Sequence, residues 1–173
     1  LAAVEAFLGA GAKRQLDADL VREGFATVTS PGRLERVRTA PTILLDGAHN
    51  PHGMAATVAT LQEEFSFSRL VAVVSTLSDK DAAAMLELLE PVVEQVVVTG
   101  NSSSRATPVN ELAAVAREVF GADRVRIAAT MPDAIEAAVQ LAEADVEGEL
   151  EGIGVLVTGS LVTVADARRL LKR

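Results

Sequence analysis

Short runs of apolar residues alternate along most of the chain with stretches in which apolar residues recur every three or four positions. The runs are rich in Val, Leu and Ile and have the length of strands that are buried on both faces. The spaced stretches have the period of helices that bury one face. Strands that alternate with helices favour a doubly wound, mostly parallel α/β sheet with helices on both faces. We predict about six strands, at residues 34–38 (an edge strand), 42–45, 70–74, 96–99, 125–128 and 153–158.

Capping signals place the helices between these strands. A polar N-cap residue satisfies free N–H groups of the first turn, and Pro suits the first helical position. Thr130 and Asp133 resemble a capping box with Asp in the Glu or Gln place, and Gly121 ends the preceding helix. The predicted starts are Asn50-Pro51, Ser78 or Asp79, Thr107-Pro108 and Thr130, and the last helix covers residues 161–171. The pattern as a whole predicts a Rossmann-like domain.

Residues 1–28 lack this alternation and have the pattern of helical segments at residues 1–8 and 17–25. From the pattern alone they can be an amino-terminal extension packed on this domain. Residues 147–152 are acidic and contain Gly, which favours a turn before the last strand.

The composition narrows the classes of function. The 173 residues suffice for one domain with a sizeable core, and no apolar run approaches the roughly 18 residues of a membrane span. The formal charge of −8 argues against general binding of nucleic acids or anionic membranes, and no Trp or Tyr is available for base stacking. The absence of cysteine permits a cytoplasmic setting. Because the chain starts at Leu1 rather than Met, we expect a fragment or a processed product.

The most informative stretch is residues 41–53, P-T-I-L-L-D-G-A-H-N-P-H-G, where a buried strand ends in a short polar turn and a helix begins. Ligands of open α/β sheets bind at the carboxyl ends of strands, and the N–H groups of a helix N-terminus favour an anion. Asp46 can accept the ribose hydroxyls of a nucleotide, or it can simply cap the turn. His49 can donate a hydrogen bond to a phosphate or a substrate carboxylate, or it can be structural.

D-G-A-H-N-P at residues 46–51, together with P-G-R-L-E at residues 31–35, resembles the signature of the folylpolyglutamate synthase/dihydrofolate synthase family. That family belongs to the Mur ligase superfamily of ATP-dependent amide-bond ligases. The resemblance covers most of the chain and corresponds to the carboxyl-terminal third of a complete enzyme. It implies that residues 29–173 are a Mur ligase-type C-terminal α/β domain and residues 1–28 the tail of an upstream ATPase domain.

The resemblance also implies that Arg33 and Asp46 contact ATP. Arginine can grip a phosphate with two hydrogen bonds or stack on a base. A solvated arginine beside a turn is the structural alternative for Arg33.

Three later loops, each after a predicted strand, hold further candidates. Lys80 lies in S-T-L-S-D-K-D at residues 75–81. Related Mur ligases use a lysine in this loop to bind a carboxylate of the incoming amino acid, and a charged first helical turn is the alternative. Arg105, in the polar loop 101–105, is a weaker candidate for substrate contact. Ser160 follows the last strand, where the superfamily uses a serine to hold a carboxylate or orient glutamate; an ordinary N-cap is the alternative.

Other kinds of site have weaker support. Asp46, His49 and His52 are spaced three apart but lack a fourth ligand nearby, which argues against a metal site. Ser160 with His49 and Asp46 lacks the G-x-S-x-G elbow of a hydrolase. The sequence contains no G-x-x-x-x-G-K-[ST] loop for ATP phosphates and no G-x-G-x-x-G after a strand for a dinucleotide.

The resemblance implies a ligase. The complete enzyme would use ATP and Mg²⁺ to phosphorylate a folate or dihydropteroate carboxylate, and the amine of L-glutamate would attack the acyl phosphate. Arg33 and Asp46 would contact the nucleotide, and His49, Lys80 and Ser160 the phosphate or glutamate, with His49 as the candidate catalytic residue. The Mg²⁺ ligands and the P-loop are expected upstream, so the chain alone should not catalyse. The alternative is a stand-alone Rossmann-like module that binds a nucleotide or an acidic metabolite.

Overall fold

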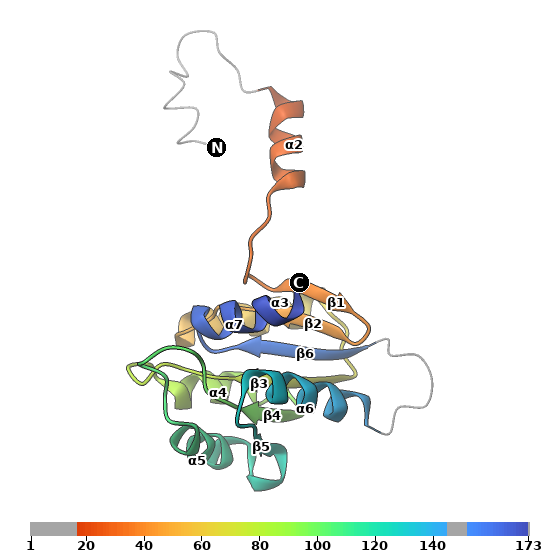
Figure 1. The fold of residues 1–173 in the computed structure, drawn as a ribbon. Coiled ribbons are helices and arrows are strands. Elements are labelled where there is room, and N and C mark those ends of the chain that lie inside the picture. The colour runs from red at the N-terminus through yellow and green to blue at the C-terminus, as the bar shows by residue number, and fades with distance from the viewer. Residues whose placement is uncertain (1–16, 145–151, 173) are drawn as a thin grey trace. The chain divides into compact units, whose positions relative to one another are not determined.

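A computed structural model of the chain describes residues 17–144 and 152–172, and it divides after Ser30 into two compact units. Figure 1 shows the fold. In the first unit, helix α2 (Ala18–Thr27) begins after the N-cap Asp17, which confirms the helix predicted there. The helix predicted at residues 1–8 and most of the predicted turn at 147–152 lie outside the described residues. Within the described ranges, no helix is long and apolar enough to cross a membrane.

The second unit is built on six strands: β1 (Glu35–Thr39), β2 (Thr42–Leu45), β3 (Arg69–Val74), β4 (Gln95–Val98), β5 (Val125–Ile127) and β6 (Ile153–Thr158). Their order in the sheet is β1-β2-β6-β3-β4-β5. β1 pairs antiparallel with β2 at one edge, and all other pairs are parallel. The sheet therefore confirms the fold predicted from the apolar runs, including the edge position of the first strand.

Helices cover both faces of this sheet, as predicted. α3 (Pro51–Glu64), α4 (Ala82–Leu89) and α5 (Val109–Phe120) pack on one face, and α6 (Met131–Glu143) and α7 (Leu161–Leu171) on the other. A short 3₁₀ helix, η1 (Ala122–Arg124), joins α5 to β5. In β3, Leu70, Ala72 and Val74 face the first set of helices, whereas Val71 and Val73 face the second. Both faces of the central strands are thus buried, because period-two alternation sends apolar side chains into two separate cores.

The helix ends agree with the capping signals except at the starts of α4 and α5. The Thr107 side chain does not cap α5, because its hydroxyl pairs with that of Thr76, and Pro108 takes the N-cap position without a side-chain hydrogen bond. Asn50 caps α3 and Thr130 caps α6, each by accepting a main-chain N–H with its side chain. The predicted cap of α4 at Ser78 or Asp79 is wrong, because Asp81 caps this helix through the Ala84 N–H. The preceding residues form a tight turn, and the Ser78 N–H donates to the Arg105 carbonyl at 2.9 Å. This pairing with a neighbouring loop delays the start of the helix.

Candidate functional site

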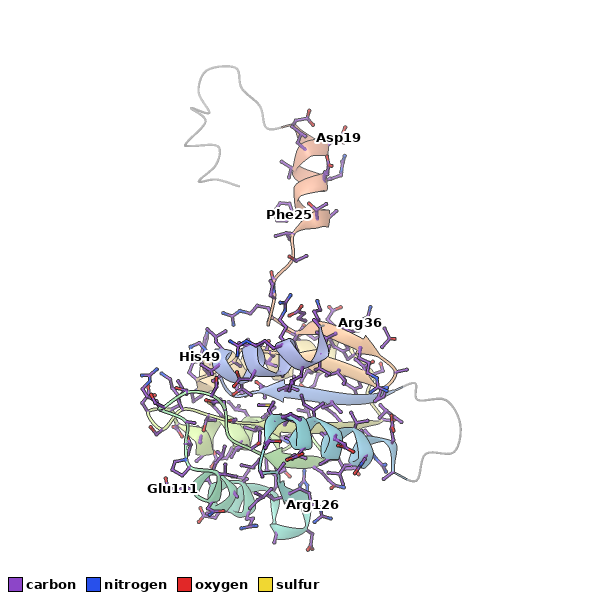
Figure 2. All side chains as sticks on the ribbon, in the orientation of Figure 1. Asp19, Phe25, Arg36, His49, Glu111 and Arg126 are labelled. Carbon is purple, nitrogen blue, oxygen red and sulfur yellow. The ribbon has the colours of Figure 1, made fainter. Side chains whose placement is uncertain are left out.

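The carboxyl ends of three neighbouring strands, β2, β6 and β3, form the candidate site. α3 follows β2 and α4 follows β3 on one face of the sheet, whereas α7 follows β6 on the other. Ligands of open α/β sheets bind at such a switch point, where the chain leaves adjacent strands in opposite directions. Figure 2 shows His49, which follows β2, at the side of the domain toward which the β6 arrow points in Figure 1.

Two hydrogen bonds join the P-G-R-L-E segment to the D-G-A-H-N turn, one on each side of Arg33. The Gly47 N–H donates to the Gly32 carbonyl at 2.7 Å, and the Leu34 N–H donates to Asp46 Oδ2 at 3.0 Å. Leu34 has a φ of 44°. Such a left-handed conformation costs a non-glycine residue about 1–3 kcal/mol and is often found at functional sites. The Arg33 side chain is exposed and forms no hydrogen bond or ion pair with any described residue.

Glu35 also holds the P-G-R-L-E segment in place. Its carboxylate accepts the Gly32 N–H at 3.0 Å, Arg168 Nε at 3.1 Å and Lys172 Nζ at 2.6 Å. Burial raises the pKa of this carboxyl, but the hydrogen bonds from Lys172, Gly32 and Arg168 outweigh it and lower the pKa from its ordinary value of 4.5. The last turns of α7 are therefore tied to the segment that carries Arg33.

The Asp46 carboxylate is buried, with 4% of the residue exposed. Oδ1 accepts the Ala48 N–H at 3.0 Å and the Thr57 hydroxyl at 2.7 Å, in addition to the Leu34 bond at Oδ2. Three protein donors thus hold this carboxylate, and Asp46 does cap the turn. A contact with ribose, which the resemblance implies, stays a prediction.

His49 is half-buried, and its Nδ1 lies 2.9 Å from the Gly47 carbonyl oxygen. Because a carbonyl only accepts, Nδ1 must carry a proton. Neutral His49 therefore presents Nε2 as an acceptor, and only the imidazolium could donate to a phosphate or carboxylate as predicted.

Lys80 and Arg105, predicted separately, lie on loops that pair with each other. Leu77 and Ala106 form an antiparallel bridge, and the two cations share Asp79, with Lys80 Nζ 3.0 Å and Arg105 Nη1 3.9 Å from its carboxylate oxygens. The hydrogen bond from Lys80 is the main reason that the pKa of Asp79 is lowered, and Arg105 adds to it. The Lys80 side chain is 30% exposed and that of Arg105 66%. Both ammonium and guanidinium groups are thus within reach of solvent.

Ser160 is buried and caps α7, accepting the Thr163 N–H at 3.0 Å. Its oxygen lies 2.8 Å from the Thr163 hydroxyl and 3.4 Å from Asn101 Nδ2. The N-cap alternative therefore describes its place in the fold, and its contact with glutamate stays a prediction.

Among the residues that the structure describes, no group of three or more His, Cys, Asp and Glu side chains could hold a metal ion. His52 is exposed in the first turn of α3, and Asp46 faces protein donors instead. The described residues therefore do not fit a Mg²⁺ site.

Residues 32–161 match a family of known sequences, the Mur ligase, glutamate ligase domain. The chain belongs to this family. It is 54% identical over 179 residues to the dihydrofolate synthase/folylpolyglutamate synthase of Mycobacterium tuberculosis, covering 100% of this chain and 37% of that relative. The chain thus spans well under half of the relative's length, which does not favour a stand-alone module.

Solved structures agree with this assignment. The Mycobacterium tuberculosis folylpolyglutamate synthase complexed with ADP and AMPPCP superposes with a TM-score of 0.89 at 52% identity, over 98% of this chain and 38% of that one. The Yersinia pestis bifunctional folylpolyglutamate synthase/dihydrofolate synthase complexed with AMPPNP and Mn ion superposes with a TM-score of 0.77 at 27% identity. The match covers 93% of this chain and 36% of that one. The resemblance inferred from the two motifs is confirmed.

In this Mur ligase domain, the candidate residues fall into two groups. Arg33 and Asp46 are joined by the hydrogen bonds around Leu34, and Lys80 and Arg105 by Asp79. No hydrogen bond or ion pair between side chains of the described residues joins one group to the other. Sequence analysis missed the two polar residues that organise these groups, Glu35 and Asn101. Glu35 lies within the P-G-R-L-E motif, but nothing in the sequence indicates that its carboxylate binds Arg168 and Lys172 at the end of α7. Asn101 was passed over as part of a polar loop.

Proposed function

We propose that this domain is the carboxyl-terminal part of an ATP-dependent ligase that joins L-glutamate to a folate or dihydropteroate carboxylate. The observation that carries the proposal is the pair of hydrogen bonds on either side of Arg33, because they join both motifs at the switch point and leave a cation exposed there. The 54% identity to a dihydrofolate synthase/folylpolyglutamate synthase supports it. In this proposal residues 1–28 are the tail of an upstream ATPase domain, residues 29–173 are the C-terminal domain, and the enzyme is cytoplasmic.

The energy source in this proposal is ATP with Mg²⁺. Relatives that bind ADP, AMPPCP, or AMPPNP with Mn ion support a nucleotide and a divalent cation. The metal ligands and the phosphate-binding loop belong to the upstream domain, because the described residues offer no metal cluster and the sequence no P-loop.

The reaction proceeds in two steps. The substrate carboxylate attacks the γ-phosphorus of ATP and forms an acyl phosphate and ADP. The amine of glutamate then adds to the acyl carbon, phosphate leaves, and the amine nitrogen loses a proton as the amide forms. The enzyme gains rate mainly by holding the amine and the acyl phosphate in register.

This chain contributes nucleotide contacts from its first group of candidates. Arg33 binds a phosphate or stacks on the base, since its guanidinium is exposed on a loop that hydrogen bonds hold on both sides of it. Asp46 accepts a ribose hydroxyl at Oδ2, which has one protein donor. His49 lies beside the N-terminus of α3, whose free N–H groups favour an anion, and it contacts a phosphate there.

The second group binds the amino acid. Lys80 and Arg105 are two adjacent cations, and glutamate carries two carboxylates. The incoming carboxylates replace Asp79 as their partner. Ser160 supports this group indirectly, because its hydroxyl contacts Asn101 and Thr163, and Asn101 lies in the loop that leads to Arg105.

Kinetics of the full-length enzyme test the proposal. Arg33→Ala should raise the KM for ATP by roughly ten- to a hundred-fold, since a charged hydrogen bond contributes about 1.5–3 kcal/mol. Lys80→Ala should raise the KM for glutamate much more than that for ATP. Both side chains are at the surface, so the melting temperature should stay unchanged. Arg36→Ala is the matched control, because Arg36 is an exposed arginine on β1, close to Arg33 in the sequence.

This chain alone, given ATP, Mg²⁺, a folate and glutamate, should release no glutamate-dependent ADP. Turnover above roughly 1 per second, an ordinary enzymatic rate, would contradict the division of labour between domains. Unchanged KM values in both Arg33→Ala and Lys80→Ala would contradict the assigned contacts.

A further inference from the structure

Asn101 occupies the centre of a polar network that joins three parts of the candidate site. Its Nδ2 lies 3.0 Å from the Ser75 hydroxyl at the end of β3, and 3.4 and 3.2 Å from the hydroxyls of Ser160 and Thr163 in the first turn of α7. Asn101 itself follows β4. Ser75, Ser160 and Thr163 have at most 1% of their surface exposed. One amide therefore ties together the carboxyl ends of β3 and β4 and the start of α7.

The protons of this network can be assigned from its geometry. The Thr163 hydroxyl lies 2.7 Å from the Ser75 carbonyl, and it must donate because a carbonyl only accepts. The Ser160 hydroxyl, 2.8 Å from that of Thr163, must then be the donor in their pair. The Ser160 oxygen in turn accepts the Thr163 N–H. Ser160 thus has no second proton to give to a ligand.

The other end of the Asn101 amide organises the loop that carries Arg105. Asn101 Oδ1 accepts the Ser103 N–H at 3.0 Å, and the Ser103 hydroxyl oxygen accepts the Arg105 N–H at 3.1 Å. The Arg105 carbonyl accepts the Ser78 N–H at 2.9 Å. Both polar atoms of the amide are therefore used within the protein, so Asn101 is placed to orient other residues and not to bind a ligand itself.

The same chain of contacts reaches Lys80. Ser78 lies in the turn closed by the hydrogen bond from the Lys80 N–H to the Leu77 carbonyl at 3.0 Å, and Asp79 of this turn pairs with Lys80 and Arg105. A shift of the loop at Asn101 would move both cations together.

We propose that Asn101 is a positioning residue that sets the place of Lys80 and Arg105 for the carboxylates of the incoming amino acid. The proposal rests on the function proposed above for these two cations. It assigns Ser160 and Thr163 to the support of Asn101, because their hydroxyl protons are already used.

The test uses the full-length enzyme and three variants. Asn101→Ala should raise the KM for glutamate by about ten- to a hundred-fold, since a misplacement of 1 Å has effects of this size, and leave the KM for ATP within about twofold. Asn101→Asp keeps the acceptor for the Ser103 N–H but turns an oxygen toward the hydroxyls of Ser160 and Thr163, whose protons are already used, so the glutamate KM should rise in it as well. The matched control is Asn110→Ala, because Asn110 is exposed on α5.

Hydrogen exchange gives a readout that needs no turnover. In Asn101→Ala, the amides of Ser78 and Arg105 should exchange faster, while those of the β3 core should keep their protection. A wild-type glutamate KM in Asn101→Asp would show that the contacts of Asn101 Nδ2 with the neighbouring hydroxyls do not position the two cations. A lowered melting temperature with unchanged KM values and unchanged loop exchange would reduce Asn101 to a stabilising residue. If the wild-type enzyme shows no glutamate-dependent turnover, the proposed function fails, and the exchange of the two loop amides still decides whether Asn101 places the loops.

Discussion

The two groups of loops at the carboxyl edge of the sheet hold their cations by different means. Arg33 is held by a buried carboxylate and by a strained residue, Leu34, whose N–H that carboxylate accepts. Lys80 and Arg105 are held through neutral hydroxyls, one amide and closely packed backbone. Carboxylates also act in the second group, but Asp79 and Asp166 are partly exposed, whereas Asp46 in the first group is buried. The first group therefore depends mainly on a buried charge and the second mainly on close contact between neutral groups, so different substitutions should damage each.

The largest effect is expected where the backbone of the second group is in closest contact. Gly159 has a φ of 108°, and a Cβ there would lie 2.5 Å from the Ser75 carbonyl oxygen. Strain and overpacking each cost about 1–3 kcal/mol, so Gly159→Ala should lower the free energy of unfolding by about 2–6 kcal/mol in denaturant titrations. Gly121→Ala is the control, with a φ of 83° and open space around it. An equal loss in both variants would show that close packing at Gly159 is unimportant.

A neutral replacement of the buried charge should have the next largest effect. Asp46→Asn keeps one acceptor but turns an N–H₂ group toward the Leu34 N–H or toward the donors at Oδ1. The loss of a charged hydrogen bond should lower the free energy of unfolding by about 1.5–3 kcal/mol in urea. Asp123→Asn, at an exposed position in η1, should change it by less than about 0.5 kcal/mol. Full stability in Asp46→Asn would contradict the dependence of the first group on charge.

Ser160→Ala separates stability from ligand binding in the second group. It removes the cap of α7 and a member of the Asn101 network, so the free energy of unfolding should fall by about 1–2 kcal/mol. Ser104→Ala, an exposed serine in the neighbouring loop, is the control. Lys80→Ala should show the opposite pattern, with normal stability and a raised glutamate KM. A stable Ser160→Ala variant with a strongly raised glutamate KM would restore Ser160 as a direct ligand.

The smallest effect is expected at Glu35, and it should depend on pH. Because folding lowers the pKa of Glu35 below 4.5, its charge stabilises the fold above that pH, and this contribution is lost as the pH falls through the folded value. Arg168 and Lys172 are each 42% exposed, so solvent screens the pairs and Glu35→Gln should cost about 1 kcal/mol at pH 7. Denaturant titrations should show that the difference in free energy of unfolding between the wild type and Glu35→Gln becomes smaller below about pH 4.5. Glu118→Gln, at an exposed site on α5, should show no such trend.

Much of the fold was predictable because the central strands are buried on both faces. The runs at residues 42–45 and 153–158 become β2 and β6 with the predicted bounds, since Val, Leu and Ile there have no competing signal. The strand order was not predictable, because the insertion of β6 between β2 and β3 depends on crossovers that leave no local mark. The start of α4 was missed for a similar reason, since Ser78 pairs with a residue far along the chain.

The candidate site was predictable in its positions and less so in its chemistry. Strand ends identified Asp46, Lys80 and Ser160 as rim residues, because carboxyl ends of parallel strands share one edge of a sheet. Their hydrogen-bond partners decide what each can still do, and those partners come from distant segments. Asn101 is the clearest case, because its three hydroxyl partners are contributed by β3 and α7.

The central position of β6 has a consequence for how the domain assembles. Every other strand is synthesised earlier, yet β6 is the one that joins the pair β1–β2 to the trio β3–β4–β5. Without Ile153–Thr158, β2 and β3 would each have an unpaired edge, and such edges are prone to pair with other chains. The segment Ile153–Thr158 therefore joins the two parts of the sheet and completes the candidate site in the same event. Chains truncated before Ile153 should accordingly be cut by protease far more readily than chains that include β6 and α7.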